Sequence, residues 1–210
     1  YIEEQMKQRL KPGMLLKERA ELLEAVIREA NHQVYSLSST SEQYAGMGTT
    51  VVAAIADPKH VVIGHIGDSR AYLFSGGKMK QLTEDHSLVN ELLRSGQINA
   101  EEAAMHPRRN VLVRALGTDP EVDIDMICQA WQEHDVLLLC TDGLSGLVQK
   151  ETIIETMNSD SGLNEKAAEL VEKALEAGGD DNVTVVLLIN EPDDMTAPLH
   201  ENDDQGGEEP

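Results

Sequence analysis

Three strongly apolar segments of this chain each adjoin an aspartate at a glycine-containing turn. Two of the aspartates follow an apolar run and the third precedes one; they are Asp68, Asp142 and Asp181. A carboxylate beside an apolar strand costs free energy unless a cation, an arginine or several hydrogen bonds match its charge. Three such residues on adjacent strands can converge at one end of a sheet, where carboxylate oxygens suit a hard divalent cation. The pattern therefore predicts a strand-rich fold with a metal site at its strand ends.

Each aspartate also has a simpler explanation. Asp68 could cap a turn or pair with Arg70, two residues further along the chain. Asp142, in a Thr-Asp-Gly sequence, could be an ordinary turn residue, and Asp181 could be a loop residue before a strand. The spacing alone leaves both interpretations open for all three residues.

The periodicity of the apolar residues predicts an α+β domain. Apolar residues at helical spacing between Met14 and Leu37 predict an amphipathic helix. Four short β-rich runs with tight turns between them predict an antiparallel meander; the runs are Thr49–Ala56, His60–Ile66, Arg70–Phe74 and Lys78–Leu82. Further strands are expected at Val122–Cys128, Val136–Thr141 and Asn182–Ile189, and further helices at Ser87–Ser95, Ala100–Met105, Lys150–Asn158 and Asn164–Ala177. Grouped strands with flanking helices favour a layered sandwich over an alternating parallel sheet.

The chain of 210 residues is long enough for one domain with a sizeable core. We place this domain at residues 1–189. The segment 190–210 is acidic and has few apolar residues, so it is expected to be a disordered tail.

Charge and cysteine content limit the possible partners. A net charge of −21 argues against nucleic acid or an anionic membrane as a partner. No apolar run approaches the roughly 20 residues that span a bilayer. Cys128 and Cys140 lie in apolar runs without metal-type spacing, so both are expected to be buried free thiols in a reducing, cytoplasmic environment.

Five short motifs follow one another along the chain; they are Met47-Gly48-Thr49-Thr50, Gly67-Asp68-Ser69-Arg70, Asp85-His86-Ser87, Thr141-Asp142-Gly143-Leu144 and Gly179-Asp180-Asp181-Asn182-Val183-Thr184. In this order and spacing they resemble the type 2C metal-dependent protein serine/threonine phosphatases, most closely the small single-domain bacterial members. The resemblance extends roughly from Leu15 to Ile189. It implies a four-layer αββα fold, in which two antiparallel sheets lie between layers of helices.

The resemblance also implies an activity. Members of this family hydrolyse phosphoserine and phosphothreonine in proteins with a water molecule that two Mn²⁺ or Mg²⁺ ions activate. The implied partners are phosphorylated proteins and a cognate bacterial serine/threonine kinase, whose action the phosphatase opposes.

The metal ligands are carried over by motif match. Asp142 and Asp181 correspond to ligands of the binuclear centre, and Asp68 corresponds to an aspartate that helps to hold a third, looser ion. Some relatives have a further aspartate where this chain has Gly146, so a third ion would be less well supplied here.

The segment 85–116 corresponds to a mobile flap beside the active site, and its candidate residues are Asp85, His86, Arg108 and Arg109. The two arginines could attract a phosphopeptide or pair with nearby acids. For the histidine, a structural hydrogen bond is favoured over acid catalysis. Outside the flap, His65 is expected to be half-buried and hydrogen-bonded, because it alternates with apolar residues in one strand.

The N-terminal motifs of the family have no counterpart in this sequence. They supply an Asp-Gly whose carboxylate bridges both metals, an arginine that grips the phosphate and, in some members, a histidine acid. The single Asp-Gly here is Asp142-Gly143. We therefore expect an N-terminally truncated phosphatase domain with an incomplete metal centre, or alternatively a regulatory or binding module. Uncovered strand edges in such a chain would favour self-association.

Overall fold

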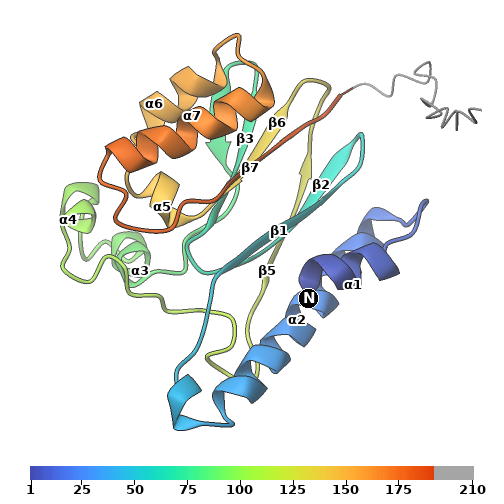
Figure 1. The fold of residues 1–210 in the computed structure, drawn as a ribbon, viewed down its shortest axis with the longest axis vertical. Coiled ribbons are helices and arrows are strands. Elements are labelled where there is room, and N and C mark those ends of the chain that lie inside the picture. Colours follow the sequence, from blue (N-terminus) through green and yellow to red (C-terminus); the bar gives the residue numbers. More distant parts are fainter. Residues whose placement is uncertain (192–210) are drawn as a thin grey trace, which may run out of the picture.

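The computed structural model describes residues 1–191 and has an α+β fold (Figure 1). Its helices are α1 (Ile2–Arg9), α2 (Leu16–Ser38), α3 (Leu88–Arg94), α4 (Ala100–Ala104), α5 (Asp142–Ser145), α6 (Lys150–Met157) and α7 (Leu163–Glu176), with a 3₁₀ turn at Glu42–Tyr44. Its strands are β1 (Val51–Ala56), β2 (His60–Ile66), β3 (Arg70–Ser75), β4 (Lys78–Gln81), β5 (Asp125–Ala130), β6 (Val136–Cys140) and β7 (Val185–Ile189). Every helix and strand expected from the sequence is present, with ends shifted by a few residues, and α1 and α5 are additional.

The strands form two antiparallel sheets between layers of helices, which confirms the predicted α+β sandwich. The first sheet has the strand order β1-β2-β5 and the second has the order β4-β3-β6-β7. Helix α2 packs on the outer face of the first sheet, and α6 and α7 cover the outer face of the second (Figure 1). A third hydrophobic cluster, which includes Trp131, fills the space between the sheets.

Strand β2 is apolar at most positions because both of its faces are covered. Val62 and Ile66 pack towards α2, whereas Val61 and Ile63 pack towards the second sheet. Successive side chains of a strand point to opposite faces, so burial on both sides favours apolar residues throughout. In the same strand, a Cβ added at Gly64 would overlap the side chain of the α2 residue Ile27, so glycine allows the helix to lie close.

The predicted four-stranded meander is wrong at its midpoint. Strand β1 pairs with β2 and β3 pairs with β4, but β2 and β3 belong to different sheets. The chain crosses between the sheets at Gly67, which has a φ of 103° that glycine adopts most readily. A Cβ at this position would also overlap Thr50. Turn residues alone do not distinguish a hairpin turn from a turn that changes sheets.

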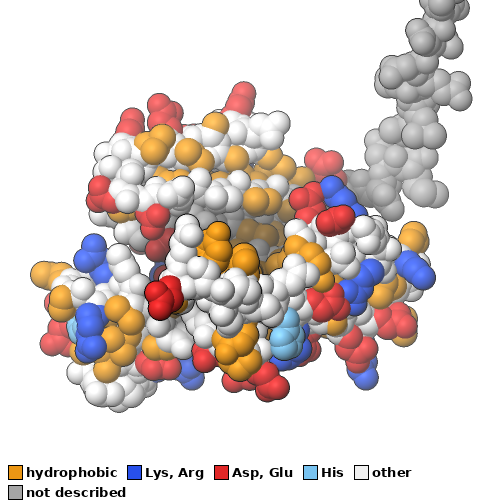
Figure 2. Space-filling model, turned by 60° about the horizontal axis from the view of Figure 1, so that its bottom comes forward, with side chains coloured by type: hydrophobic (Ala, Val, Ile, Leu, Met, Phe, Trp, Pro, Cys, Tyr) orange, Lys and Arg blue, Asp and Glu red, His pale blue; other side chains and the backbone are white. Residues whose placement is uncertain are grey.

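Helix α1 borders a large hydrophobic cavity. The cavity has a volume of about 760 Å³ and lies between α1 and strands β1, β6 and β7. Figure 2 shows hydrophobic side chains around a hollow on one face of the molecule. Strands β1 and β7 each stand at the end of their sheet, so each has one edge without a strand partner among residues 1–191.

Two expectations about burial need correction. Asn190, which we assigned to the tail, is buried and bonded to neighbouring backbone groups. Cys128 is exposed, whereas Cys140 is buried as expected, and both thiols are free. Residues 192–210 lie outside the described part, so the predicted disordered tail stays a prediction. Within the described part, none of the helices is long and apolar enough to cross a membrane.

Candidate metal centre and flap

The three predicted aspartates lie at the same end of the second sheet. Asp68 stands in the turn that leads into β3, Asp142 is the first residue of α5 directly after β6, and Asp181 lies in the loop before β7. Strands β3, β6 and β7 are adjacent and antiparallel, and their register aligns the start of β3 with the end of β6 and the start of β7. The aspartates are therefore neighbours in space although they are far apart in the sequence.

A cavity of about 460 Å³ has all three aspartates in its wall. Asp68 and Asp142 are half-buried, and Asp181 is exposed. The threonines Thr49 and Thr50 belong to the same wall and add hydroxyl oxygens. Carboxylate oxygens are the charged donors here, and such a donor set suits Mn²⁺ or Mg²⁺.

Burial and neighbouring carboxylates disfavour the charged forms of Asp68 and Asp142. Burial and then the charges of Asp142 and Asp85 raise the pKa of Asp68 to about 6. The pKa of Asp142 is raised as well, first by burial and then by the charge of Asp181. Loss of hydration and nearby like charges both disfavour the ionised form of a carboxyl group. A divalent cation would offset both effects, so the residues present fit the expected ions.

Thr141 and Gly143 hold the loop before β7 against α5. The Thr141 hydroxyl donates to the carbonyl oxygen of Asn182 at 3.1 Å and accepts from the backbone N–H of Thr184 at 3.0 Å. A Cβ added at Gly143 would overlap the Asn182 carbonyl, so the close approach depends on glycine. Sequence reasoning assigned no role to Thr141, although it stands in one of the five motifs.

Arg70 pairs with Asp85 rather than with Asp68. Its Nε donates to Asp85 Oδ1 at 2.9 Å and its Nη2 donates to Asp85 Oδ2 at 2.6 Å. This two-pronged contact matches the planar guanidinium to the carboxylate and fixes the start of the flap. The ion pair occupies the Asp85 carboxylate, and the simpler explanation in which Arg70 neutralises Asp68 by direct pairing is wrong.

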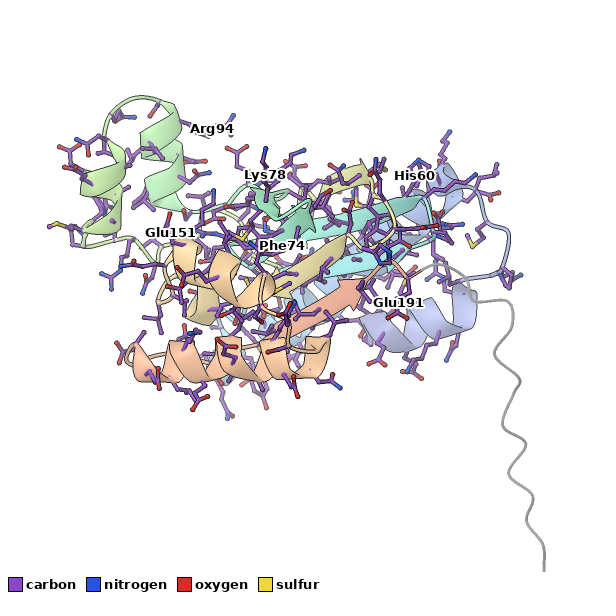
Figure 3. All side chains as sticks on the ribbon, turned by 90° about the horizontal axis from the view of Figure 1, so that it is seen from above. His60, Phe74, Lys78, Arg94, Glu151 and Glu191 are labelled. Carbon is purple, nitrogen blue, oxygen red and sulfur yellow. The ribbon has the colours of Figure 1, made fainter. Side chains whose placement is uncertain are left out.

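The flap forms a separate lobe beside the sheets. Helices α3 and α4 stand apart from both sheets in Figure 3, where Arg94 marks the end of α3. The Ser87 hydroxyl caps α3 by accepting from the backbone N–H of Asn90, and the Asn99 side chain caps α4. The two halves of the flap meet at its base, where Ser87 and Leu112 form an antiparallel bridge.

A second cavity, of about 390 Å³, lies between the predicted flap and the candidate metal centre. Asp68 and Asp142 belong to its wall on one side, and the flap supplies Asp85 and Arg109. Arg108 is not part of this wall. Asn90 is also in the wall, and sequence reasoning missed it because an asparagine in a short helix carries no distinctive signal.

A further cluster of ligand-type atoms lies behind the turn at Gly67. The candidate ligand atoms of His65, His86 and Asp125 all lie within 4.8 Å of one another. However, His86 Nδ1 accepts a 3.0 Å hydrogen bond from the Gly67 N–H, so in a neutral ring Nε2 carries the proton. That Nε2 faces Asp125 Oδ2 at 3.2 Å, and a cation there would have to displace the proton. The geometry therefore favours a hydrogen-bonded network over a metal site.

His65 is fully buried, and neither of its ring nitrogens has a hydrogen-bond partner among residues 1–191. The expectation of a half-buried, hydrogen-bonded residue is wrong because both faces of β2 are covered. The ring centroid lies 4.7 Å from that of His86. Burial and then the neighbouring imidazole lower the pKa of His65 to about 4, so the ring is neutral near pH 7.

Comparison with known proteins gives a consistent result. A sequence profile of the family described as Protein phosphatase 2C matches residues 1–182. The serine/threonine phosphatase stp of Listeria innocua is 46% identical over 166 residues, which are 79% of this chain and 66% of that protein. The protein phosphatase PhpP of Streptococcus pneumoniae is 42% identical over 165 residues, 78% of this chain and 66% of that protein. The matched part thus spans just under two thirds of these relatives.

Solved structures share the fold. The serine/threonine phosphatase Stp1 of Staphylococcus aureus superposes with a TM-score of 0.83 at 34% identity, covering 90% of this chain and 75% of that one. The catalytic domain of the serine/threonine protein phosphatase PstP, in complex with two manganese ions, gives a TM-score of 0.78 at 34% identity and covers 89% and 76%. The profile match and these structures agree with the five motifs, and the chain belongs to the protein phosphatase 2C family.

Proposed function

We propose that the full-length protein hydrolyses phosphoserine and phosphothreonine in other proteins with the help of Mn²⁺ or Mg²⁺. The observation that carries this proposal is the convergence of Asp68, Asp142 and Asp181 on one cavity, where burial and neighbouring carboxylates disfavour the charges of Asp68 and Asp142. When bound, the cations would lower the pKa of a water molecule and neutralise charge on the phosphoryl oxygens. The family membership and the names of the relatives support the same reaction.

Within this proposal the aspartates have different roles. Asp142 follows β6, which lies between β3 and β7 in the second sheet, so Asp142 stands between Asp68 and Asp181. We assign Asp142 and Asp181 to a pair of ions and Asp68 to a third, more weakly held ion. The bond from Thr141 to the loop before β7 would set the separation of the first two ligands.

The flap arginines suit a phosphorylated substrate. Arg109 lines the cavity shared by the flap and the aspartates, and it makes no ion pair within the described residues. An unpaired guanidinium there would attract the phosphate dianion of a phosphopeptide. Arg108 is exposed next to it and would add to the attraction, whereas Asp85 and His86 would hold the flap base in position.

The expected biological setting follows from the same proposal. A phosphoserine and phosphothreonine phosphatase opposes a serine/threonine kinase, and the named relatives are bacterial. The two unpaired cysteines are compatible with the reducing cytoplasm expected from the sequence.

The proposal is tested by phosphate release from a phosphothreonine peptide by the full-length protein, with Mn²⁺ and with EDTA. Asp181→Asn is expected to abolish the Mn²⁺-dependent rate. Asp180→Asn is a matched control, because Asp180 is the preceding residue of the same loop but does not line the cavity. The absence of EDTA-sensitive turnover in the wild-type protein would sink the assignment.

A second candidate applies to the chain taken alone, namely a binding or regulatory module that self-associates. The observation in its favour is the apolar cavity beside the open edges of β1 and β7. On β7, Val186 and Leu188 are 49% and 41% exposed. Exposed apolar residues on an unpaired strand edge favour pairing with another chain. Measurement of Mn²⁺ affinity separates the candidates, because a module without a metal site would show none.

A further inference from the structure

His86 makes three hydrogen bonds that join the metal centre to the flap. Its backbone N–H donates to the Gly67 carbonyl at 2.8 Å, and its Nδ1 accepts from the Gly67 N–H at 3.0 Å. Its own carbonyl accepts from the N–H of Val113 at 2.9 Å. One residue thus binds both polar groups of Gly67 and also the returning end of the flap.

The turn that His86 holds is the one that carries Asp68. Gly67, the residue before Asp68, has a left-handed backbone conformation with a φ of 103°. Such a conformation persists only where surrounding contacts favour it. The Gly67 N–H donates to the His86 side chain and the Gly67 carbonyl accepts from the His86 backbone N–H, so His86 fixes the direction in which the chain leaves the turn.

A polar chain fixes the ring of His86 in return. The ring is buried, with its Nε2 facing Asp125 Oδ2 at 3.2 Å. The other oxygen of Asp125 accepts from Arg114 at 2.8 Å, and Arg114 belongs to the last part of the flap. His65 packs against the same ring with a centroid separation of 4.7 Å. The imidazole is therefore held by the first sheet and by the C-terminal end of the flap.

We infer that His86 is a positioning residue that couples the order of the flap to the placement of the Asp68 carboxylate. The coupling depends on the neutral ring with its proton on Nε2, because only then does Nδ1 accept from Gly67 while Nε2 donates to Asp125. A flap that is ordered around substrate would hold the Asp68 turn in place, and a displaced turn would loosen the flap. This inference rests on the proposed function, in which Asp68 holds a cation and the flap lies over the substrate.

Two amide substitutions test the two ring nitrogens of His86 separately. In His86→Asn the amide oxygen lies close to the position of Nδ1, so it can still accept from Gly67. In His86→Gln the amide lies close to the position of Nε2, so it can reach Asp125 but leaves the Gly67 N–H without an acceptor. The loss of a buried hydrogen bond corresponds to roughly tenfold in an equilibrium constant.

We expect His86→Gln to weaken Mn²⁺ binding about tenfold and to speed hydrogen exchange at the amides of Gly67 and Val113 by a similar factor. We expect His86→Asn to keep both properties near their wild-type values. Equal effects in the two variants, or a larger effect in His86→Asn, would overturn the inference. A loss of melting temperature that is equal in both variants would not produce this difference between them.

The tautomer is tested without any substitution. Long-range ¹H–¹⁵N correlation spectra of the wild-type protein should show His86 protonated at Nε2 and unprotonated at Nδ1. A proton on Nδ1 overturns the inference even if both variants fail to fold. If the wild-type protein neither binds Mn²⁺ nor releases phosphate, the proposed function fails, while hydrogen exchange still decides whether His86 couples the flap to the turn.

Discussion

Arg70 donates hydrogen bonds to Asp85 from two guanidinium nitrogens, and this ion pair joins the first residue of β3 to the first residue of the flap. The side chains are 28% and 14% exposed, so the charges are only partly screened by water. We expect Arg70→Ala to lower the free energy of unfolding by about 2 kcal/mol, because it leaves a half-buried carboxylate without its cation. Urea denaturation measures this change.

The double variant shows whether the pair itself is responsible. Arg70→Ala combined with Asp85→Ala should be less destabilised than the sum of the single variants, with a coupling energy of about 1 kcal/mol or more. Additive losses would mean that the guanidinium acts through other contacts, such as its hydrogen bond to Tyr72.

Replacement of Asp142 should stabilise the metal-free protein while it impairs metal binding. Burial and the charge of Asp181 disfavour the Asp142 carboxylate, so Asp142→Asn removes an unfavourable charge. We expect a higher melting temperature than wild type in EDTA and a smaller rise on addition of Mn²⁺. Melting curves in both conditions test this, and a lower melting temperature in EDTA would contradict the repulsion argument.

Acid should destabilise the fold through His65. Its pKa is about 4 in the folded protein, against the ordinary histidine value of 6.5 expected for the unfolded chain, so the folded protein binds fewer protons between these values. The contribution of the neutral His65 ring to the free energy of unfolding is therefore fully present above pH 6.5. It is lost as the pH falls towards 4, by ~3 kcal/mol in total. In His65→Leu this part of the pH dependence should disappear. Denaturation curves across the mildly acidic range check the difference, and parallel profiles for the two proteins would exclude His65 as the cause.

Gly143→Ala should disturb the candidate metal centre from the side of α5. The new methyl group would overlap the Asn182 carbonyl and push the Asp181 loop outward. We expect a destabilisation of about 1–3 kcal/mol and weaker Mn²⁺ binding. Gly162→Ala is the control, because a Cβ there has its nearest neighbour at 3.9 Å and no strained backbone. Similar behaviour of both variants in Mn²⁺ titrations would argue against a role for the close approach.

A charge on the open edge of β7 should reduce self-association of the chain. Val186 is 49% exposed and lines the hydrophobic cavity, so Val186→Lys places an ammonium group at the unpaired edge. Edge charges oppose strand pairing between molecules. Light scattering should show a lower mean mass for the variant, and a monodisperse monomer for the wild-type chain would remove the basis of this prediction.

Local sequence patterns were sufficient to predict the helices and strands and to predict that the aspartates lie close together. The helix at α2 follows from apolar residues at helical spacing, and the strand at β6 follows from a short continuous apolar run beside a turn. Asp142 and Asp181 could be placed together because both stand where a strand meets a turn. Adjacent strands then bring such turns to one end of a sheet.

The pairing between side chains could not be predicted from local sequence patterns. Sequence proximity suggested Arg70 as a partner for Asp68, but side-chain direction on β3 sends the guanidinium to Asp85 instead. The burial of His65 was missed because alternation indicates a half-exposed strand unless a second sheet is known to cover it. The change of sheet at Gly67 depends on that same packing, which no local signal contains.

Because the chain changes sheets at Gly67, the three carboxylates are not all attached to the same part of the fold. Asp142 and Asp181 are carried by the second sheet, whereas Asp68 stands on the link between the two sheets. A small sliding of one sheet over the other would change the distance from Asp68 to Asp142 and leave that between Asp142 and Asp181 unaltered. In the proposed three-ion arrangement, substitutions in the layer between the sheets, around Trp131, would then change the affinity for the ion at Asp68 more than the affinity for the pair at Asp142 and Asp181.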